Sequence, residues 1–113
     1  MLFRSVTTYE LGPEDFFLPE VDPAGLAGGD AAHNAAVIRR VLAGDGIGNG
    51  EPLEAVFNAA AMTAALALMA AWIHIPREPV GLMYGVAVVR EVIADGRAAN
   101  VLATWARISQ EPA

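Results

Sequence analysis

The sequence contains no cysteine and no lysine. Without cysteine, neither a disulfide framework nor a thiolate metal site can form, and the redox compartment stays open. The only fixed cations are arginines, and Asp and Glu outnumber them by 13 to 7, for a formal net charge of −6. Nucleic-acid binding needs clustered basic side chains that neutralise phosphates, so this composition argues against a nucleic-acid partner.

The first residues do not indicate a secretory signal, because no apolar segment follows a basic start. We therefore expect a cytoplasmic protein. The longest apolar stretch, residues 55–75, is rich in alanine and includes Asn58, Thr63 and His74. A membrane-spanning helix needs about 20 strongly apolar residues, so this stretch indicates a buried core helix and no membrane partner.

What the chain has in excess is apolar residues: 55% are hydrophobic and 18% are charged. A chain of 113 residues is expected to form a single domain, residues 1–113, with one core. This composition is rich for a small domain that is exposed to water on all sides. We therefore expect apolar surface that the chain does not cover by itself.

The pattern predicts a mainly α fold with one N-terminal β-strand (α+β). Residues 2–11 carry the β-branched and aromatic residues of a strand, and residues 12–29 form a connection in which Phe16, Phe17 and Leu18 attach to the core. Asp30 is a suitable N-cap for the first of about four helices, expected near residues 31–43, 52–73, 79–95 and 97–109. The second is apolar all round, so the others should pack about this central, Ala-rich helix.

A single strand leaves its backbone donors and acceptors without a ladder. We therefore expect the strand to pair across a homodimer or with the sheet edge of a complementary protein chain. Such a partner would also cover the excess apolar surface.

Few residues present themselves for chemistry. His33 lies on a first helical turn, where the helix dipole favours a neutral imidazole that could act as a base. His74 could line the mouth of a pocket, with Tyr9, Glu10 and Tyr84 as further polar anchors. An adaptable cavity for an apolar small molecule could be lined by Phe57, Met62, Met69, Trp72 and Met83. Each of these also has a plain structural explanation as a solvated or core residue. No spacing supports a metal site, and no cofactor is expected.

Three parts of the sequence carry recognisable motifs: residues 11–19 read LGPEDFFLP, residues 26–44 begin with LAGGD, and residues 58–61 and 89–98 read NAAA and VREVIADGRA. Together they resemble the C-terminal portion of the anthranilate phosphoribosyltransferase family. In the first part the family usually has Pro-Glu-Asp-Phe-Gly-Leu, so Phe17 stands at a glycine position. Residues 26–44 (LAGGDAAHNAAVIRRVLAG) are similar to the family's Gly-Gly-Asp helix start, with His33 where Glu is common. Residues 58–61 (NAAA) and 89–98 (VREVIADGRA) resemble the family's last helices.

The resemblance implies a truncated homologue. The family's diphosphate loop, magnesium-binding acidic pair and most anthranilate contacts precede this portion and are not matched. Gly28, Gly29 and Asp30 offer a weak alternative phosphate site at a helix start, where Asp30 would place a carboxylate against the phosphate. We therefore expect no autonomous phosphoribosyl transfer, but a dimeric or partner-binding helper, or one half of a split transferase. The alternative is a repurposed small enzyme of specialised metabolism, acting on an apolar metabolite in a helix-lined cavity.

Overall fold

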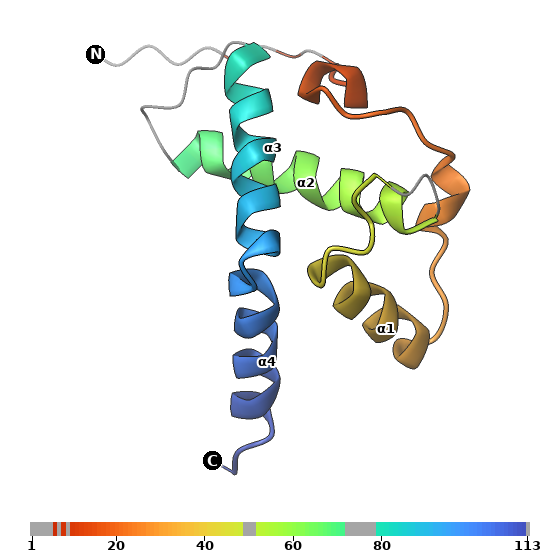
Figure 1. The fold of residues 1–113 in the computed structure, drawn as a ribbon, viewed down its shortest axis with the longest axis vertical. Coiled ribbons are helices and arrows are strands. Elements are labelled where there is room, and N and C mark those ends of the chain that lie inside the picture. Colours follow the sequence, from red (N-terminus) through yellow and green to blue (C-terminus); the bar gives the residue numbers. More distant parts are fainter. Residues whose placement is uncertain (1–5, 7, 9, 49–51, 72–78, 113) are drawn as a thin grey trace.

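The computed structural model describes residues 6, 8, 10–48, 52–71 and 79–112. Two short 3-10 turns, η1 (Pro13–Phe16) and η2 (Pro23–Leu26), precede the α-helices. These helices are α1 (Ala31–Leu42), α2 (Pro52–Ala71), α3 (Pro79–Ala94) and α4 (Arg97–Ser109). In Figure 1, α2 crosses α3, α4 continues below α3, and α1 lies beside their junction. The bounds lie close to those expected from the sequence, although residues 72 and 73 fall outside the described part.

The helix ends follow from local chemistry. The Asp30 carboxylate accepts a 2.8 Å hydrogen bond from the His33 backbone N–H, which confirms Asp30 as the N-cap of α1. Pro52 and Pro79 each stand at the first position of a helix, where the missing N–H is not needed. Gly96 separates α3 from α4 with φ of 83°, a left-handed conformation that glycine adopts at little cost.

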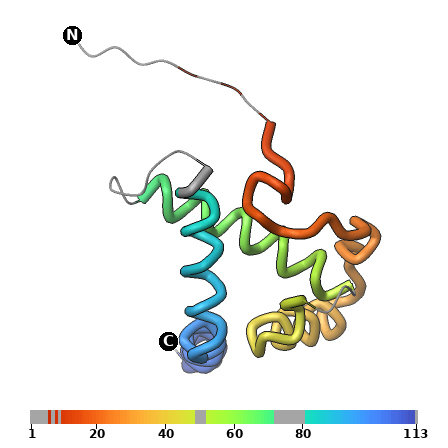
Figure 2. Tube along the Cα trace, turned by 45° about the horizontal axis from the view of Figure 1, so that its top comes forward, coloured from red at the N-terminus to blue at the C-terminus, as the bar shows by residue number. Residues whose placement is uncertain are grey.

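The core is built on the crossing of α2 and α3. Ala61 and Ala65 of α2 are fully buried, and a Cβ atom added to Gly85 of α3 would lie 2.7 Å from the Ala65 Cβ. Only two small residues allow the helix backbones to approach this closely. Phe57, Leu82, Val86 and other apolar side chains extend this contact into one cluster. Much of α2 is thereby shielded by α3 and by the 3-10 turns (Figure 2).

The predicted N-terminal strand over residues 2–11 is wrong. Of that stretch, Val6, Thr8, Glu10 and Leu11 are described, and they form no regular secondary structure. The rest, including Tyr9, lies outside the described residues. The described part of the chain is helical and offers no sheet edge, so an isolated strand would have no ladder to satisfy its backbone groups. The α+β class and the pairing of a strand across a dimer or with a partner are corrected accordingly.

Helix α2 is long and apolar enough to cross a membrane by length and composition, and 44% of its most apolar window is buried inside the protein. A single such helix is weak evidence for a span, because the core helix of a soluble protein meets the same criterion. Its buried face, from Leu53 through Phe57 and Ala61 to Ala65, belongs to the core cluster. The core position of this face explains much of its apolar composition.

Candidate functional site

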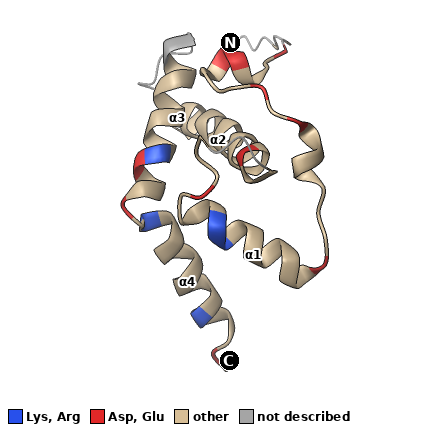
Figure 3. Ribbon diagram, turned by 45° about the vertical axis from the view of Figure 1, so that its right-hand side comes forward, with Lys and Arg blue, Asp and Glu red and all other residues tan. Residues whose placement is uncertain are grey.

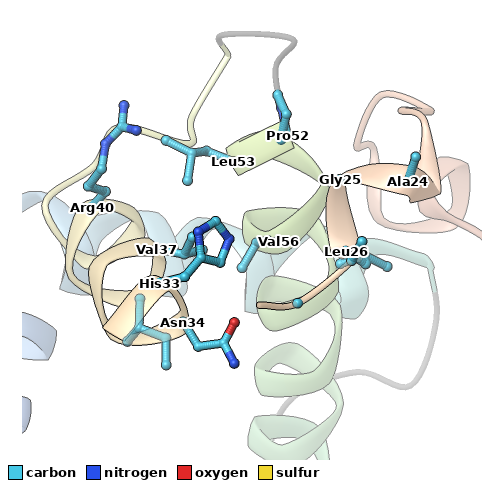
Figure 4. Close-up of a pocket in the computed structure, with 13 residues that line it drawn as sticks. Ala24, Gly25, Leu26, His33, Asn34, Val37, Arg40, Pro52, Leu53 and Val56 are labelled. Carbon is cyan, nitrogen blue, oxygen red and sulfur yellow. The ribbon is translucent and has the colours of Figure 1, made fainter. Parts of the chain in front are cut away.

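A groove of about 820 Å³ lies between η2, α1 and α2 (Figure 4). Its size falls within the range of small-molecule sites. Leu26, Val37, Leu53 and Val56 give it an apolar lining, and the His33 side chain lies among them. The remaining lining residues are Ala24, Gly25, Ala27, Gly28, Asn34, Ile38, Arg40 and Pro52.

One end of the groove is shaped by a side chain that holds the backbone. Asn34 accepts a 2.9 Å hydrogen bond from the Gly29 N–H and donates one of 3.0 Å to the Gly29 carbonyl. Together with the Asp30 cap, this pairing fixes the entry into α1. The motif at residues 28–34 therefore acts structurally, and the capping carboxylate of Asp30 stands where a phosphate would have to bind.

The two glycines before Asp30 are needed for close side-chain approach. A Cβ atom at Gly29 would lie 2.8 Å from His33 Cδ2, and one at Gly28 would lie 3.3 Å from Asn34 Oδ1. Both side chains fold back over the glycine backbone. This packing holds the imidazole of His33 at the wall of the groove, although the residue is also exposed to solvent.

The charge of the groove differs from that of the chain. No Asp or Glu lines it, although the chain has a net charge of −6, and its ionisable lining residues are Arg40 and His33. Arg40 Nε also lies 3.2 Å from Asp45 Oδ2, in an exposed ion pair of small energetic value. An apolar groove with a cation at its rim suits a small molecule that has an apolar body and an acidic group.

Apart from His33, the predicted site residues that the structure describes do not line this groove. Phe57 is 1% exposed, and Met62 and Met69 pack partly buried against the core. Met83 and Tyr84 are exposed on α3, and Glu10 is exposed before η1. Trp72, His74 and Tyr9 lie outside the described residues. Among the described candidates, His33 alone lines the groove, and the functional roles of all these residues stay predictions.

Asn58 is a buried polar residue whose role the sequence did not indicate. Its side chain is 2% exposed, and Nδ2 donates a 2.9 Å hydrogen bond to the carbonyl of Pro19. The sequence feature that could have pointed to this role is the amide side chain of Asn58 within an almost continuously apolar helix. Asn58 ties the connection before η2 to α2, so its role is to hold the groove-forming segments together.

The groove thus lies between η2, the capped helix α1 and the core helix α2. Comparison of the sequence with known proteins shows the family to which the chain belongs. Residues 4–99 match the family model described as "Glycosyl transferase family, a/b domain", and the chain belongs to this family. Within it, the similar curated proteins are anthranilate phosphoribosyltransferases, which confirms the resemblance drawn from the sequence motifs.

Anthranilate phosphoribosyltransferase 2 of Streptomyces coelicolor is 35% identical over 108 residues, which cover 95% of this chain and 28% of that protein. The enzyme of Leifsonia xyli is 38% identical over 88% of this chain and 28% of its own length. That of Nocardioides sp. is 37% identical over 82% and 25%. The chain thus spans about a quarter of the length of these relatives. No solved structure gives a significant match.

Proposed function

We propose that these 113 residues do not transfer phosphoribosyl groups by themselves, and that they act as a cytoplasmic, partner-binding helper within the family. The partner is a second copy or a complementary polypeptide, as in a split transferase. The observation that carries the proposal is the apolar surface of α4, a helix of 13 residues of which none is buried. Exposed apolar patches mark interaction surfaces in water-soluble proteins.

The first half of the proposal is supported by the extent of the match. The name of the Streptomyces coelicolor relative describes the activity of a whole chain, and the matched segment is 28% of it. In addition, three polar residues of the matched segment have structural roles. Asp30 and Asn34 hold the start of α1, and Asn58 holds the connection to α2.

The proposal is tested by a transfer assay. The purified chain is incubated with phosphoribosyl diphosphate, magnesium and anthranilate, and the loss of anthranilate fluorescence is followed. We expect no turnover above a blank without protein, while an intact relative gives a positive signal. Turnover by the chain alone would contradict the proposal. Turnover that needs an added polypeptide covering the remainder of the Streptomyces coelicolor relative would support the split-transferase version.

A second candidate function rests on the charge of the groove. A groove without acidic residues in a chain of net charge −6, with Arg40 and His33 in its lining, favours an anionic ligand with an apolar body. This is the arrangement that a repurposed small enzyme of specialised metabolism would use to hold its substrate. His33 would then stand close enough to the ligand to exchange a proton with it.

An NMR titration separates this candidate from an empty groove. Benzoate serves as the anionic probe and benzamide as its neutral counterpart of similar shape. We expect benzoate to shift the resonances of His33, Val37 and Val56, and Arg40→Gln to weaken benzoate binding while leaving benzamide unaffected. Equal binding of both probes, or no shift at these residues, would reject the candidate.

A further inference from the structure

The groove between η2, α1 and α2 carries hydrogen-bonding side chains at two separate places along α1. His33 and Arg40 both line it, and Figure 4 shows them at different positions along the helix. Their numbers differ by seven, which is almost two helical turns, so both leave the same face with a rise of roughly 10 Å between them. Val37 lies between them on that face. The groove therefore presents a polar group, an apolar stretch and a second polar group in a row.

Both polar groups keep hydrogen-bonding capacity within the described part of the chain. Arg40 pairs with Asp45 through Nε, 3.2 Å from Oδ2, and its two terminal Nη nitrogens have no acceptor among the described residues. The imidazole of His33 also has no partner among them. The other polar side chain in the lining, the amide of Asn34, is engaged twice by the backbone of Gly29. A ligand would therefore find its hydrogen-bonding partners at the two ends of this row.

The stretch between the two ends is apolar and has no carboxylate in its lining. Its walls come from three elements, through Leu26, Val37, Leu53 and Val56. Helix α1 itself has no acidic residue, and its two arginines lie together near its end (Figure 3). Asp45 stands outside the lining and holds Arg40 only in an exposed ion pair, which a ligand can exchange at small cost. The charge of the groove thus favours an anionic ligand over a cationic one.

The spacing of the two polar groups sets the length of a ligand that reaches both. Three bonds of an extended chain span ~3.8 Å, so each bond adds ~1.3 Å. A chain of about nine carbons then covers the rise of roughly 10 Å. A carboxylate can accept two parallel hydrogen bonds from a guanidinium, and an imidazole N–H can donate to a second acceptor. A ligand with a carboxylate at each end and methylene groups between them satisfies both groups and the apolar wall.

We propose that the groove binds a linear dicarboxylate of about nine carbons, with one carboxylate on the guanidinium of Arg40 and the other on the imidazole of His33. The proposal rests on the second candidate function and narrows its ligand from an anion with an apolar body to a chain with two acidic ends. A fatty acid or an aromatic acid would use Arg40 and leave His33 without an acceptor.

An NMR titration of the full chain with linear dicarboxylates tests the length of the ligand. Glutarate, azelate and dodecanedioate have about five, about nine and about twelve carbons, and nonanoate is the counterpart of azelate with a single carboxylate. We expect azelate to shift the resonances of His33, Val37 and Arg40. It should bind about 5-fold or more tightly than glutarate, dodecanedioate or nonanoate, because it alone matches both polar groups without bending.

Two variants test the two ends. Arg40→Gln should weaken azelate binding by about 5-fold or more, whereas Arg39→Gln, which changes an exposed arginine outside the groove lining, is the matched control and should leave it unchanged. His33→Phe keeps a ring over Gly29 but loses the N–H groups, so it should reduce the affinity for azelate to that for nonanoate. Circular dichroism verifies that all three variants keep the helical content of the original chain.

Three outcomes overturn the proposal. Affinity that rises steadily through dodecanedioate, with nonanoate equal to azelate, shows a groove that holds apolar chains without recognising a second carboxylate. A preference for azelate that persists in His33→Phe shows that His33 is not the second anchor. Benzoate binding that depends on Arg40, without any preference for azelate over nonanoate, refutes the inference while the second candidate function stands. If neither benzoate nor azelate shifts the groove resonances, the inference and that candidate function fail together.

Discussion

Phe17 provides a sharp test of how the chain enters its core. Its backbone has φ of 59° and ψ of 36°, a left-handed conformation that is rare for a bulky residue, and its side chain is 66% exposed. The neighbours Phe16 and Leu18 are both buried. The left-handed residue turns the chain so that both neighbours reach the core, and the ring of Phe17 is left outside. This geometry explains why glycine is usual here in the family that the sequence resembles.

The perturbation is a comparison of Phe17→Gly with Phe17→Ala. Both variants lose the same aromatic ring, so the difference between them isolates the backbone. An L-residue pays ~1–2 kcal/mol for the left-handed conformation. Glycine escapes this cost but loses roughly 0.5–1 kcal/mol more conformational entropy on folding. We therefore expect Phe17→Gly to be more stable than Phe17→Ala by about 1 kcal/mol.

The assay is urea unfolding followed by circular dichroism, at one protein concentration and with linear extrapolation to water. Ala99→Gly is the control, because Ala99 is exposed within α4, where glycine should cost about 1 kcal/mol relative to alanine. We thus expect glycine to be more stable than alanine at position 17 and less stable than alanine at position 99. If Phe17→Ala proved as stable as Phe17→Gly or more so, the reasoning from the left-handed turn would be refuted.

The other predictions concern the helix start, the helix crossing and the α3–α4 junction. Asp30→Ala removes the acceptor of the 2.8 Å cap bond and should lower the free energy of unfolding by about 1 kcal/mol in thermal melting. Gly85→Val should lower the free energy of unfolding by roughly 1–3 kcal/mol, because the new Cβ would meet Ala65. Its control, Ala87→Val on the exposed side of α3, should lower it by less than about 1 kcal/mol. Equal effects of the two substitutions would contradict the close crossing of α2 and α3. The pKa of Asp95 is lowered from its ordinary value of 3.8, mainly because its carboxylate accepts a hydrogen bond from the Arg97 backbone N–H. The ionised carboxylate therefore stabilises the folded state above pH 3.8, and this stabilisation is lost as the pH falls through the folded-state pKa. Asp95→Asn should flatten the acid limb of a stability–pH profile, and an unchanged profile would count against this bond.

The sequence predicted the helices well because their signals are local. Asp30 before α1, Pro52 and Pro79 at the starts of α2 and α3, and Gly96 between α3 and α4 act through neighbouring backbone groups. Such signals do not depend on the rest of the fold.

The predicted strand failed for the opposite reason. Residues 2–11 have strand-forming side chains, but a strand is stable only when a neighbour completes its ladder. The described part of the chain supplies no neighbouring strand. Composition could not reveal that, because pairing is a property of the whole fold.

The sequence by itself therefore determined where the helices begin and end, that α2 is the core helix, and which residues share the apolar side of α4. Tertiary structure alone decided that Phe17 faces outward while Phe16 and Leu18 face inward. It also left the apolar residues Val101, Trp105 and Ile108 of α4 exposed. It also joined Leu26, Val37 and Val56 into one groove from three separate elements. The physical reason is that capping and periodicity act within a few residues, whereas burial depends on which distant segments meet.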